Sequence, residues 1–168
     1  MQGRRSGSRR KLSKTHGQKH KAKQKDSSRT RQNLMLKYLN RKIVEELHAA
    51  IIAETHDQVP ERSHVLNPSA LELALELPKK CLYGQELYPD LFDKASVLMR
   101  ELIRGHAFEA ANKRTGYMAA LTFLDENGYD LESTVDEAKL ITTEIAMDKV
   151  DVKEVAKWLR KHSKPKTT

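Results

Sequence analysis

Apolar residues recur at helical spacing from Leu34 to Leu159, whereas the first 32 residues show no such pattern. Spacings of three and four residues place apolar side chains on one face of a helix, and no segment shows the convincing alternation of a half-buried strand. The pattern therefore predicts an all-α domain of about six helices, with any strands limited to short pieces in the loops. We expect residues 33–163 to form this domain and residues 164–168 to form a C-terminal tail.

The first predicted helix covers residues 40–54, and its first residue is an asparagine that is typical of a helix N-cap. Ile43, Leu47 and Ile51 recur at every fourth position and are predicted to form the buried face of this helix. His48 borders that face. We interpret His48 as a structural histidine rather than a catalytic one, because no partner motif accompanies it.

Five further helices are predicted from capping residues and apolar spacing. Two capping boxes, each a Thr or Asp followed three residues later by Glu, mark the starts of the last two helices. The third helix has the widest apolar face and is expected to be central in the core. The five predicted helices cover 67–77, 89–105, 112–126, 134–147 and 151–162, and the segment 83–89 is predicted to be a loop.

The net charge of +8 is unevenly distributed along the chain. Residues 1–32 hold twelve Lys or Arg against the single acid Asp26, so the remainder carries about −3. This N-terminal segment has too little apolar surface to offset the cost of ordering its backbone and is predicted to be a disordered basic tail. Such a tail would contact RNA, DNA or the ribosome nonspecifically. The alternatives, a merely solubilising tail or a misassigned start, stay open.

Several classes of protein are excluded by composition. No apolar run approaches the roughly 18 residues of a membrane span, and the N-terminus is too cationic for a signal peptide, so we expect a cytoplasmic protein without membrane contact. Cys81 is the single cysteine, which rules out an intrachain disulfide. We expect its side chain to be buried as a small apolar group. No Cys/His grouping has the spacing of a zinc site.

The segment 106–114 carries polar residues between two strongly apolar helices. Lys113 and Arg114 fall in the first turn of a predicted helix, where the helix dipole disfavours cations unless an anion binds there. His106 ends the preceding helix and could act as general base on an incoming hydroxyl group. These residue types indicate phosphoryl or nucleotidyl transfer. Taken without further context, they also fit a helix cap at His106 and surface ion pairs at the two cations.

The spacing within this segment resembles that of a known family. Residues 106–115 read H-A-F-E-A-A-N-K-R-T, which is similar to the H-x-F-x-D/N-x-N-K-R motif of Doc toxins within the wider Fic family. The segments 87–95 and 123–129 resemble the family's sequence before and after this motif. The resemblance covers about 125 residues, from 37 to 161. It implies a compact all-α bundle of the Fic/Doc type.

The resemblance also implies an activity. In the family the histidine is the general base, here His106, and the residues matching Asn112, Lys113 and Arg114 orient the phosphates of a nucleotide. Lys113 replaces the glycine of the adenylylating branch, which favours a protein kinase that uses ATP and Mg²⁺. The known Doc substrate is a hydroxyl side chain of elongation factor Tu, so a translation factor is the expected target. A toxin or growth regulator, controlled by a separate antitoxin, is implied.

The chain departs from the family pattern at one position that bears on catalysis. The residue that helps to hold Mg²⁺ in the family corresponds to Ala110, whose methyl group binds no metal, so no protein metal ligand is predicted. Ala111 stands where many relatives have Gly. Two alternatives therefore remain beside an active kinase. One is a weakened or inactive protein that binds a nucleotide or a partner, and the other is a Fic-type protein adenylyltransferase.

Overall fold

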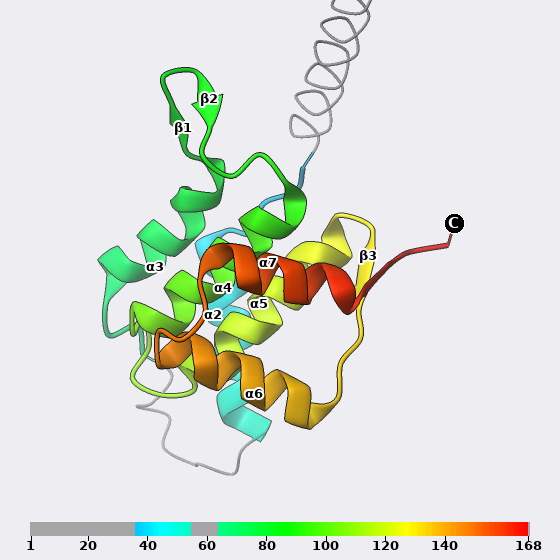
Figure 1. The fold of residues 1–168 in the computed structure, drawn as a ribbon. Helices are drawn as coiled ribbons and strands as arrows, with labels where there is room; N and C mark the ends of the chain where they lie inside the picture. The colour runs from blue at the N-terminus through cyan, green and yellow to red at the C-terminus, as the bar shows by residue number, and fades with distance from the viewer. Residues whose placement is uncertain (1–35, 55–63, 168) are drawn as a thin grey trace, which may run out of the picture. The chain divides into compact units, whose positions relative to one another are not determined.

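A computed structural model describes residues 36–54 and 64–167 of the chain. By its internal contacts the chain divides into two units, and all the elements described below belong to the second unit, residues 37–168. The predicted basic tail, residues 1–32, lies outside the described residues, so its disorder stays a prediction. The described part contains six α-helices and little strand, which confirms the all-α prediction (Figure 1). The helices are α2 (Arg41–Glu54), α3 (Pro68–Glu76), α4 (Leu91–Arg104), α5 (Asn112–Glu126), α6 (Val135–Ala146) and α7 (Val152–Lys161).

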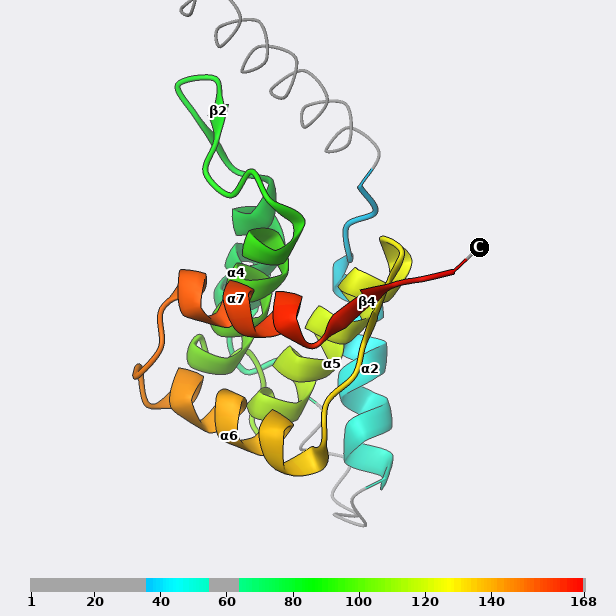
Figure 2. The same cartoon turned by 45° about the vertical axis from the view of Figure 1, so that its right-hand side comes forward.

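Helix α4 is the centre of the core, as its wide apolar face predicts. It packs against α3, α5, α6 and α7, and ten of its residues are buried (Figures 1 and 2). Helices α4 and α5 approach closely at Gly116. A Cβ atom at Gly116 would lie 2.6 Å from Cγ1 of Ile103, closer than real Cβ atoms come to other heavy atoms. Glycine therefore permits the close contact of the two helices that flank the motif segment.

The helix starts follow from side-chain caps. The Asn67 side chain accepts a hydrogen bond from the backbone N–H of Ala70 and caps α3, and Asp90 accepts from Phe92 and caps α4. Both predicted capping boxes are present, at the starts of α6 and α7. Because these caps satisfy N–H groups that a helix leaves without an internal partner, they fix where each helix begins.

The buried face of α2 is rotated relative to the prediction. Its buried residues are Val44, His48, Ile51 and Ile52, while Ile43 and Leu47 are only partly buried. Of the predicted stripe, Ile51 is therefore buried, Ile43 is partly buried and packs against the core, and Leu47 is partly buried. The reason lies in the packing of α2 against α5, which covers the side of α2 that carries His48. Leu47 is left to line a groove that is described below.

Two short antiparallel strand pairs complete the unit. Strands β1 (Cys81–Leu82) and β2 (Gln85–Glu86) form a hairpin that overlaps the start of the predicted loop 83–89. Cys81 is exposed on this hairpin, so the prediction of a buried thiol was wrong. The 3₁₀ turn η2 (Leu77–Lys79) precedes the hairpin. The pair β3 (Tyr129–Leu131) and β4 (Ser163–Pro165) joins the chain after α5 to residues that the sequence assigned partly to a C-terminal tail.

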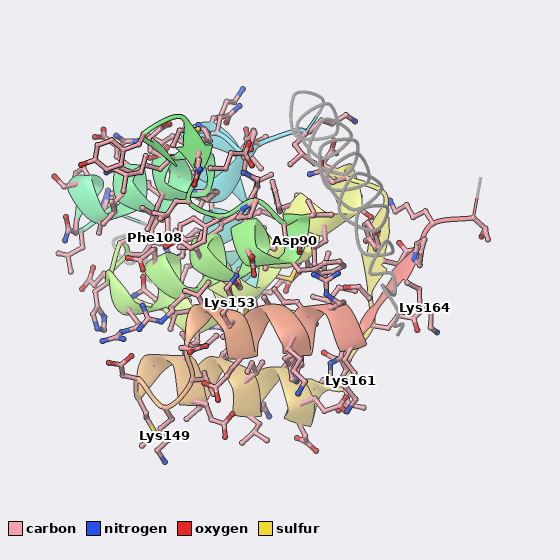
Figure 3. The ribbon with its side chains drawn as sticks, turned by 45° about the horizontal axis from the view of Figure 1, so that its top comes forward. Asp90, Phe108, Lys149, Lys153, Lys161 and Lys164 are labelled. Atoms are coloured by element: carbon pink, nitrogen blue, oxygen red, sulfur yellow. The ribbon has the colours of Figure 1, made fainter. Side chains whose placement is uncertain are left out.

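Charged side chains connect α4 to the hairpin β1–β2, to the turn η2 and to α7. Lys94 of α4 is 1% exposed, and its Nζ donates to the carbonyl oxygen of Pro78 at 2.9 Å and lies 3.2 Å from the Glu86 carboxylate. Lys153 of α7 reaches toward α4 (Figure 3) and pairs with Asp93 at 2.6 Å. A buried lysine is tolerated because it is both paired and hydrogen-bonded. None of the described helices is long and apolar enough to cross a membrane.

Candidate active site at the start of helix α5

The motif segment connects α4 to α5 and starts with a tight helix end. Gly105 is the C-cap of α4, and a Cβ atom there would lie 2.7 Å from the carbonyl oxygen of Glu101 and 3.0 Å from Cβ of Ala70 in α3. His106 follows with a left-handed φ of 46° and an exposed side chain. The chain thus leaves α4 abruptly, and His106 reaches solvent while the next residues turn back into the protein.

The middle of the connection is buried and paired with the segment before α3. Ala107 is fully buried and Phe108 is 1% exposed. Val65 forms an isolated antiparallel bridge with Phe108, and the Ala107 carbonyl accepts hydrogen bonds from the N–H groups of Leu66 at 2.9 Å and Asn67 at 3.1 Å. The connection is therefore held by backbone hydrogen bonds as well as by its buried phenyl ring.

Asn112 closes the connection on itself. Its Oδ1 accepts from the Phe108 N–H at 3.0 Å, and its Nδ2 donates to the Phe108 carbonyl at 2.7 Å. Both polar atoms of the side chain thus bind the backbone of one residue four positions earlier. The second N–H of the amide keeps a donor available for another group. In this geometry Asn112 shapes the connection, and its predicted part in binding nucleotide phosphates stays a prediction.

The N-terminus of α5 has no side-chain cap. Its N-cap residue is Ala111, which adopts a left-handed φ of 57°, and the first turn contains no acidic residue. The unpartnered N–H groups of a helix start carry partial positive charge and attract anions. All other long helices for which a cap is described use Asn, Asp or Thr at this place. An uncapped start with two adjacent cations is the arrangement expected of an anion-binding site.

Lys113 and Arg114 are both exposed on the first turn of α5. No carboxylate among residues 36–54 and 64–167 forms an ion pair with either cation. Within the described residues, Nζ of Lys113 makes one long side-chain hydrogen bond, 3.5 Å to Oγ1 of Thr143. Surface ion pairs, one of the two interpretations of these cations, are therefore not found in the described part of the chain. Their charge is open to an external anion.

A histidine from another helix supports the connection from behind. His48 of α2 is fully buried, its ring stacks on Phe108 with centroids 3.9 Å apart, and its Nδ1 shares a hydrogen bond of 3.0 Å with Oγ1 of Thr115. The structural interpretation of His48 agrees with this burial, but its contacts to the motif could not be read from the sequence. The available signal was a histidine at helical spacing from Val44, which a buried position would oblige to find a partner.

Comparison of the sequence with known proteins identifies the family of this chain. The model of the Fic/DOC family matches residues 38–124, about half of the chain. Toxin Doc of Mycolicibacterium smegmatis is 40% identical over 88 residues, which are 51% of this chain and 68% of that protein. Protein kinase doc of Escherichia phage P1 is 38% identical over 72 residues, 43% of this chain and 56% of that protein. The chain belongs to the Fic/DOC family.

The position that the family resemblance assigns to a metal ligand is Ala110 in this Fic/DOC protein. Ala110 is partly buried and offers only a methyl group, while the neighbouring Glu109 is exposed. Among the described residues no three His, Cys, Asp or Glu side chains form a group that could hold a metal ion. The residues present at the motif therefore do not fit a protein-held Mg²⁺.

A groove of about 380 Å³ opens beside the motif of this Fic/DOC protein. Apolar side chains make most of its wall, and Lys113 and Arg114 also line it, so the groove and the candidate anion site share two residues. Leu47, which the sequence predicted to be buried, forms part of the wall. The groove is lined by residues of α2 (Leu47, Ala50, Ile51, Glu54), of α5 (Lys113, Arg114, Tyr117, Met118) and of α6 with the residues before it (Ser133, Thr134, Val135, Ala138, Lys139, Thr142).

Proposed function

We propose that this protein is a Doc-like phosphotransferase that uses ATP to modify a protein hydroxyl group. It would act in the cytoplasm as a toxin or growth regulator of a toxin–antitoxin system, with a translation factor such as elongation factor Tu as the target. The observation that carries the proposal is the uncapped start of α5, where Lys113 and Arg114 have no carboxylate partner among the described residues. Membership of the Fic/DOC family and the two relatives named as a toxin and a protein kinase support it.

The proposed step is a displacement at the γ-phosphorus of ATP. His106 takes the proton of the target hydroxyl, the freed oxygen bonds to the γ-phosphorus, and the bond to the β,γ-bridging oxygen breaks, releasing ADP. The backbone N–H groups at the start of α5, together with Lys113 and Arg114, hold the phosphates and offset the charge that develops on them. Asn112 contributes by fixing the connection between base and cations, and its remaining N–H is directed to a phosphate oxygen.

A second candidate rests on Ala110. Because the described residues supply no protein ligand for a metal at the motif, transfer is expected to be slower than in relatives that have one. In the limit the protein would bind a nucleotide or a partner without transferring a group. A Fic-type adenylyltransferase is disfavoured, because Lys113 occupies the position of the glycine in the adenylylating branch.

The decisive experiment compares wild type, His106→Ala and Ala110→Asp. Each protein is incubated with ATP and Mg²⁺ in a translation-competent lysate, with label on the γ-phosphorus in one set and on the α-phosphorus in another. Labelled proteins are identified and weighed intact. We expect wild type to add one phosphoryl group to a target, His106→Ala to add none, and Ala110→Asp to add it faster, because a carboxylate returns at the metal position.

The other outcomes of this experiment would contradict the active kinase or the role of His106. Labelled target with Ala110→Asp alone would support the binding protein and reject the active kinase. Transfer of the α-label would identify an adenylyltransferase. Equal labelling by wild type and His106→Ala would remove the histidine from the mechanism. Circular dichroism of both variants controls for the fold, which should be unchanged because both positions lie in the connection rather than in a helix.

We also propose that the groove beside the motif receives a segment of the antitoxin. The wall is mostly apolar and also includes Lys113 and Arg114, so the fitting occupant is a helix with an apolar face and a carboxylate that meets these cations. Such a carboxylate would occupy the anion site and compete with nucleotide phosphates. Binding of the segment and inhibition of transfer would then be one event.

The groove proposal is tested by substitution on α6. Ala138→Arg fills the groove from its α6 side, whereas Leu140→Arg lies on the same helix at a position that is 61% exposed and outside the groove. Both are co-expressed with each protein encoded beside the chain's own gene. Ala138→Arg should lose capture and relief of toxicity, and Leu140→Arg should keep both. Equal capture by the two variants would place the antitoxin elsewhere.

The basic tail, residues 1–32, is proposed to add nonspecific contact with nucleic acid or the ribosome. Deleting it should lower affinity for a random RNA and flatten the salt dependence of binding, because fewer phosphates are neutralised. Transfer rates should not change. Identical binding of both forms across a salt series would reject this role.

A further inference from the structure

His48 joins the two ends of the motif through one buried ring. Phe108 lies two residues after His106, and Thr115 directly follows Arg114. The His48 imidazole stacks on Phe108 with an interplanar angle of 16° and shares its Nδ1 hydrogen bond with Thr115. Since His48 and Thr115 are fully buried and Phe108 is 1% exposed, these contacts are shielded from water.

The chemistry of this ring goes beyond what packing alone requires. A leucine or phenylalanine would fill the same space in an apolar core without needing a hydrogen-bond partner, whereas a buried imidazole is costly unless its nitrogens are satisfied. The hydrogen bond to Thr115 is directional, so it fixes how α2 and the first turn of α5 are rotated relative to each other. The stacked Phe108 ring then has one preferred position.

We propose that His48 is a positioning residue that sets the separation between His106 and the cations of α5. It cannot touch the reacting atoms, because its side chain lies behind Phe108 and has no access to solvent. A displacement of the general base by about 1 Å costs roughly 100-fold in rate, so small shifts of the connection matter for catalysis. The kinetic consequence rests on the proposed function, whereas the order of the connection does not.

Three substitutions separate positioning from packing. Thr115→Val removes the hydrogen bond to His48 while keeping the shape of the side chain, whereas Thr115→Ser keeps the hydroxyl group. His48→Phe keeps a ring against Phe108 but loses the hydrogen bond to Thr115. Ile145→Val, a buried change in α6, is the matched control for a general loss of stability. All four proteins are first compared by thermal unfolding, so that variants of similar Tm can be paired.

The first readout is hydrogen exchange of the Phe108 amide, which donates to Asn112. We expect exchange at least tenfold faster in Thr115→Val and His48→Phe than in wild type, and unchanged within twofold in Ile145→Val and Thr115→Ser. If Thr115→Val changes this amide no more than a control of the same Tm, His48 only packs and the proposal is overturned. This readout needs no substrate and decides the matter even for a protein that transfers nothing.

The second readout is the rate of phosphoryl transfer. Positioning predicts that Thr115→Val lowers kcat about tenfold with the KM for ATP within twofold, because phosphate contacts survive and the base is displaced. Thr115→Ser should recover most of kcat. If the wild type transfers no phosphoryl group, only the proposed function is contradicted, because hydrogen exchange still tests the positioning role of His48. Equal kcat in wild type and Thr115→Val, measured in an active enzyme, would overturn the positioning role.

Discussion

The buried side and the exposed side of the segment 106–115 differ in their contacts and in their charge. On one side, His48, Phe108 and Thr115 are buried and make a stack and a hydrogen bond with each other. On the other side, Lys113 and Arg114 are exposed and have no carboxylate partner in the described part of the chain. The inner side therefore holds the connection in place, and the outer side carries unbalanced charge.

The comparison shows that features at the start of α5 that favour anion binding also lower the stability of the helix. Two adjacent cations in the first turn of a helix oppose its dipole, and a missing cap leaves N–H groups without a side-chain acceptor. Both features lower the stability of α5, and both favour an external anion. The buried side offsets that cost, so the predictions below ask whether each side can be changed without the other.

The largest expected effect is on the buried side. Phe108→Ala should lower the free energy of unfolding by about 3–5 kcal/mol, because it removes a ring that is 1% exposed and stacked on His48. Urea unfolding measures it. Tyr83→Ala is the control, since that aromatic ring is 97% exposed and should cost no more than about 0.5 kcal/mol. Similar losses in both variants would show that the inner side does not carry the stability.

The next effect concerns the charged side alone. Lys113→Ala and Arg114→Ala should each weaken ATP binding about tenfold or more, which is roughly 1.4 kcal/mol. Stability should stay the same or rise by about 0.3–1 kcal/mol, because a cation is removed from a helix start. Lys157→Ala removes an exposed lysine of α7 and should leave ATP binding unchanged. Titration calorimetry and thermal unfolding measure the two quantities, and a loss of stability without a loss of binding would contradict the separation.

The sequence predicted the helices well because their signals are local. The caps at Asn67, Thr134 and Asp151 each depend on residues within one turn, and the structure has all three. The range 112–126 of α5 was also predicted without error, although its start has no side-chain cap. The buried face of α2 was not, because Ile43 and Leu47 are apolar but packing with α5 decides which side of the helix is covered.

The candidate site was only partly readable from the sequence. The cations and His106 were found from their position between two apolar helices and from the motif spacing. The contact of His48 with Thr115 joins residues 67 positions apart, and no local pattern encodes it. The same holds for the double hydrogen bond of Asn112 to the Phe108 backbone, which depends on the left-handed turn at Ala111.

A smaller effect on the free energy of unfolding is expected at Ala111, the residue before α5. Ala111 has a φ of 57°, a region that costs a residue with a Cβ roughly 1 kcal/mol relative to glycine. Ala111→Gly should therefore raise the free energy of unfolding, by less than about 1 kcal/mol because glycine also gains freedom in the unfolded chain. Thermal unfolding measures the change. A decrease would show that the methyl group of Ala111 packs usefully against the connection.

The smallest effect tests a charge that is paired, in contrast to those of the motif. Burial acts to raise the pKa of Asp90, but hydrogen bonds from Arg160 and from the Phe92 N–H outweigh it, so the pKa lies below its usual range. A lowered carboxyl pKa contributes stability above the pKa of the unfolded chain, about 4, and this contribution is lost as the pH falls through the folded pKa. Asp90→Asn can still cap α4 but loses the ion pair with Arg160, a side chain that is itself half exposed. The free energy of unfolding of wild type should therefore exceed that of the variant by about 0.5 kcal/mol at pH 7, and the difference should vanish as the pH falls through the folded pKa of Asp90. Unfolding of both proteins across this pH range measures it. A difference that persists in acid would assign the contribution of Asp90 to its cap rather than to its charge, and the contrast with Lys113 and Arg114 would then be one of capping alone.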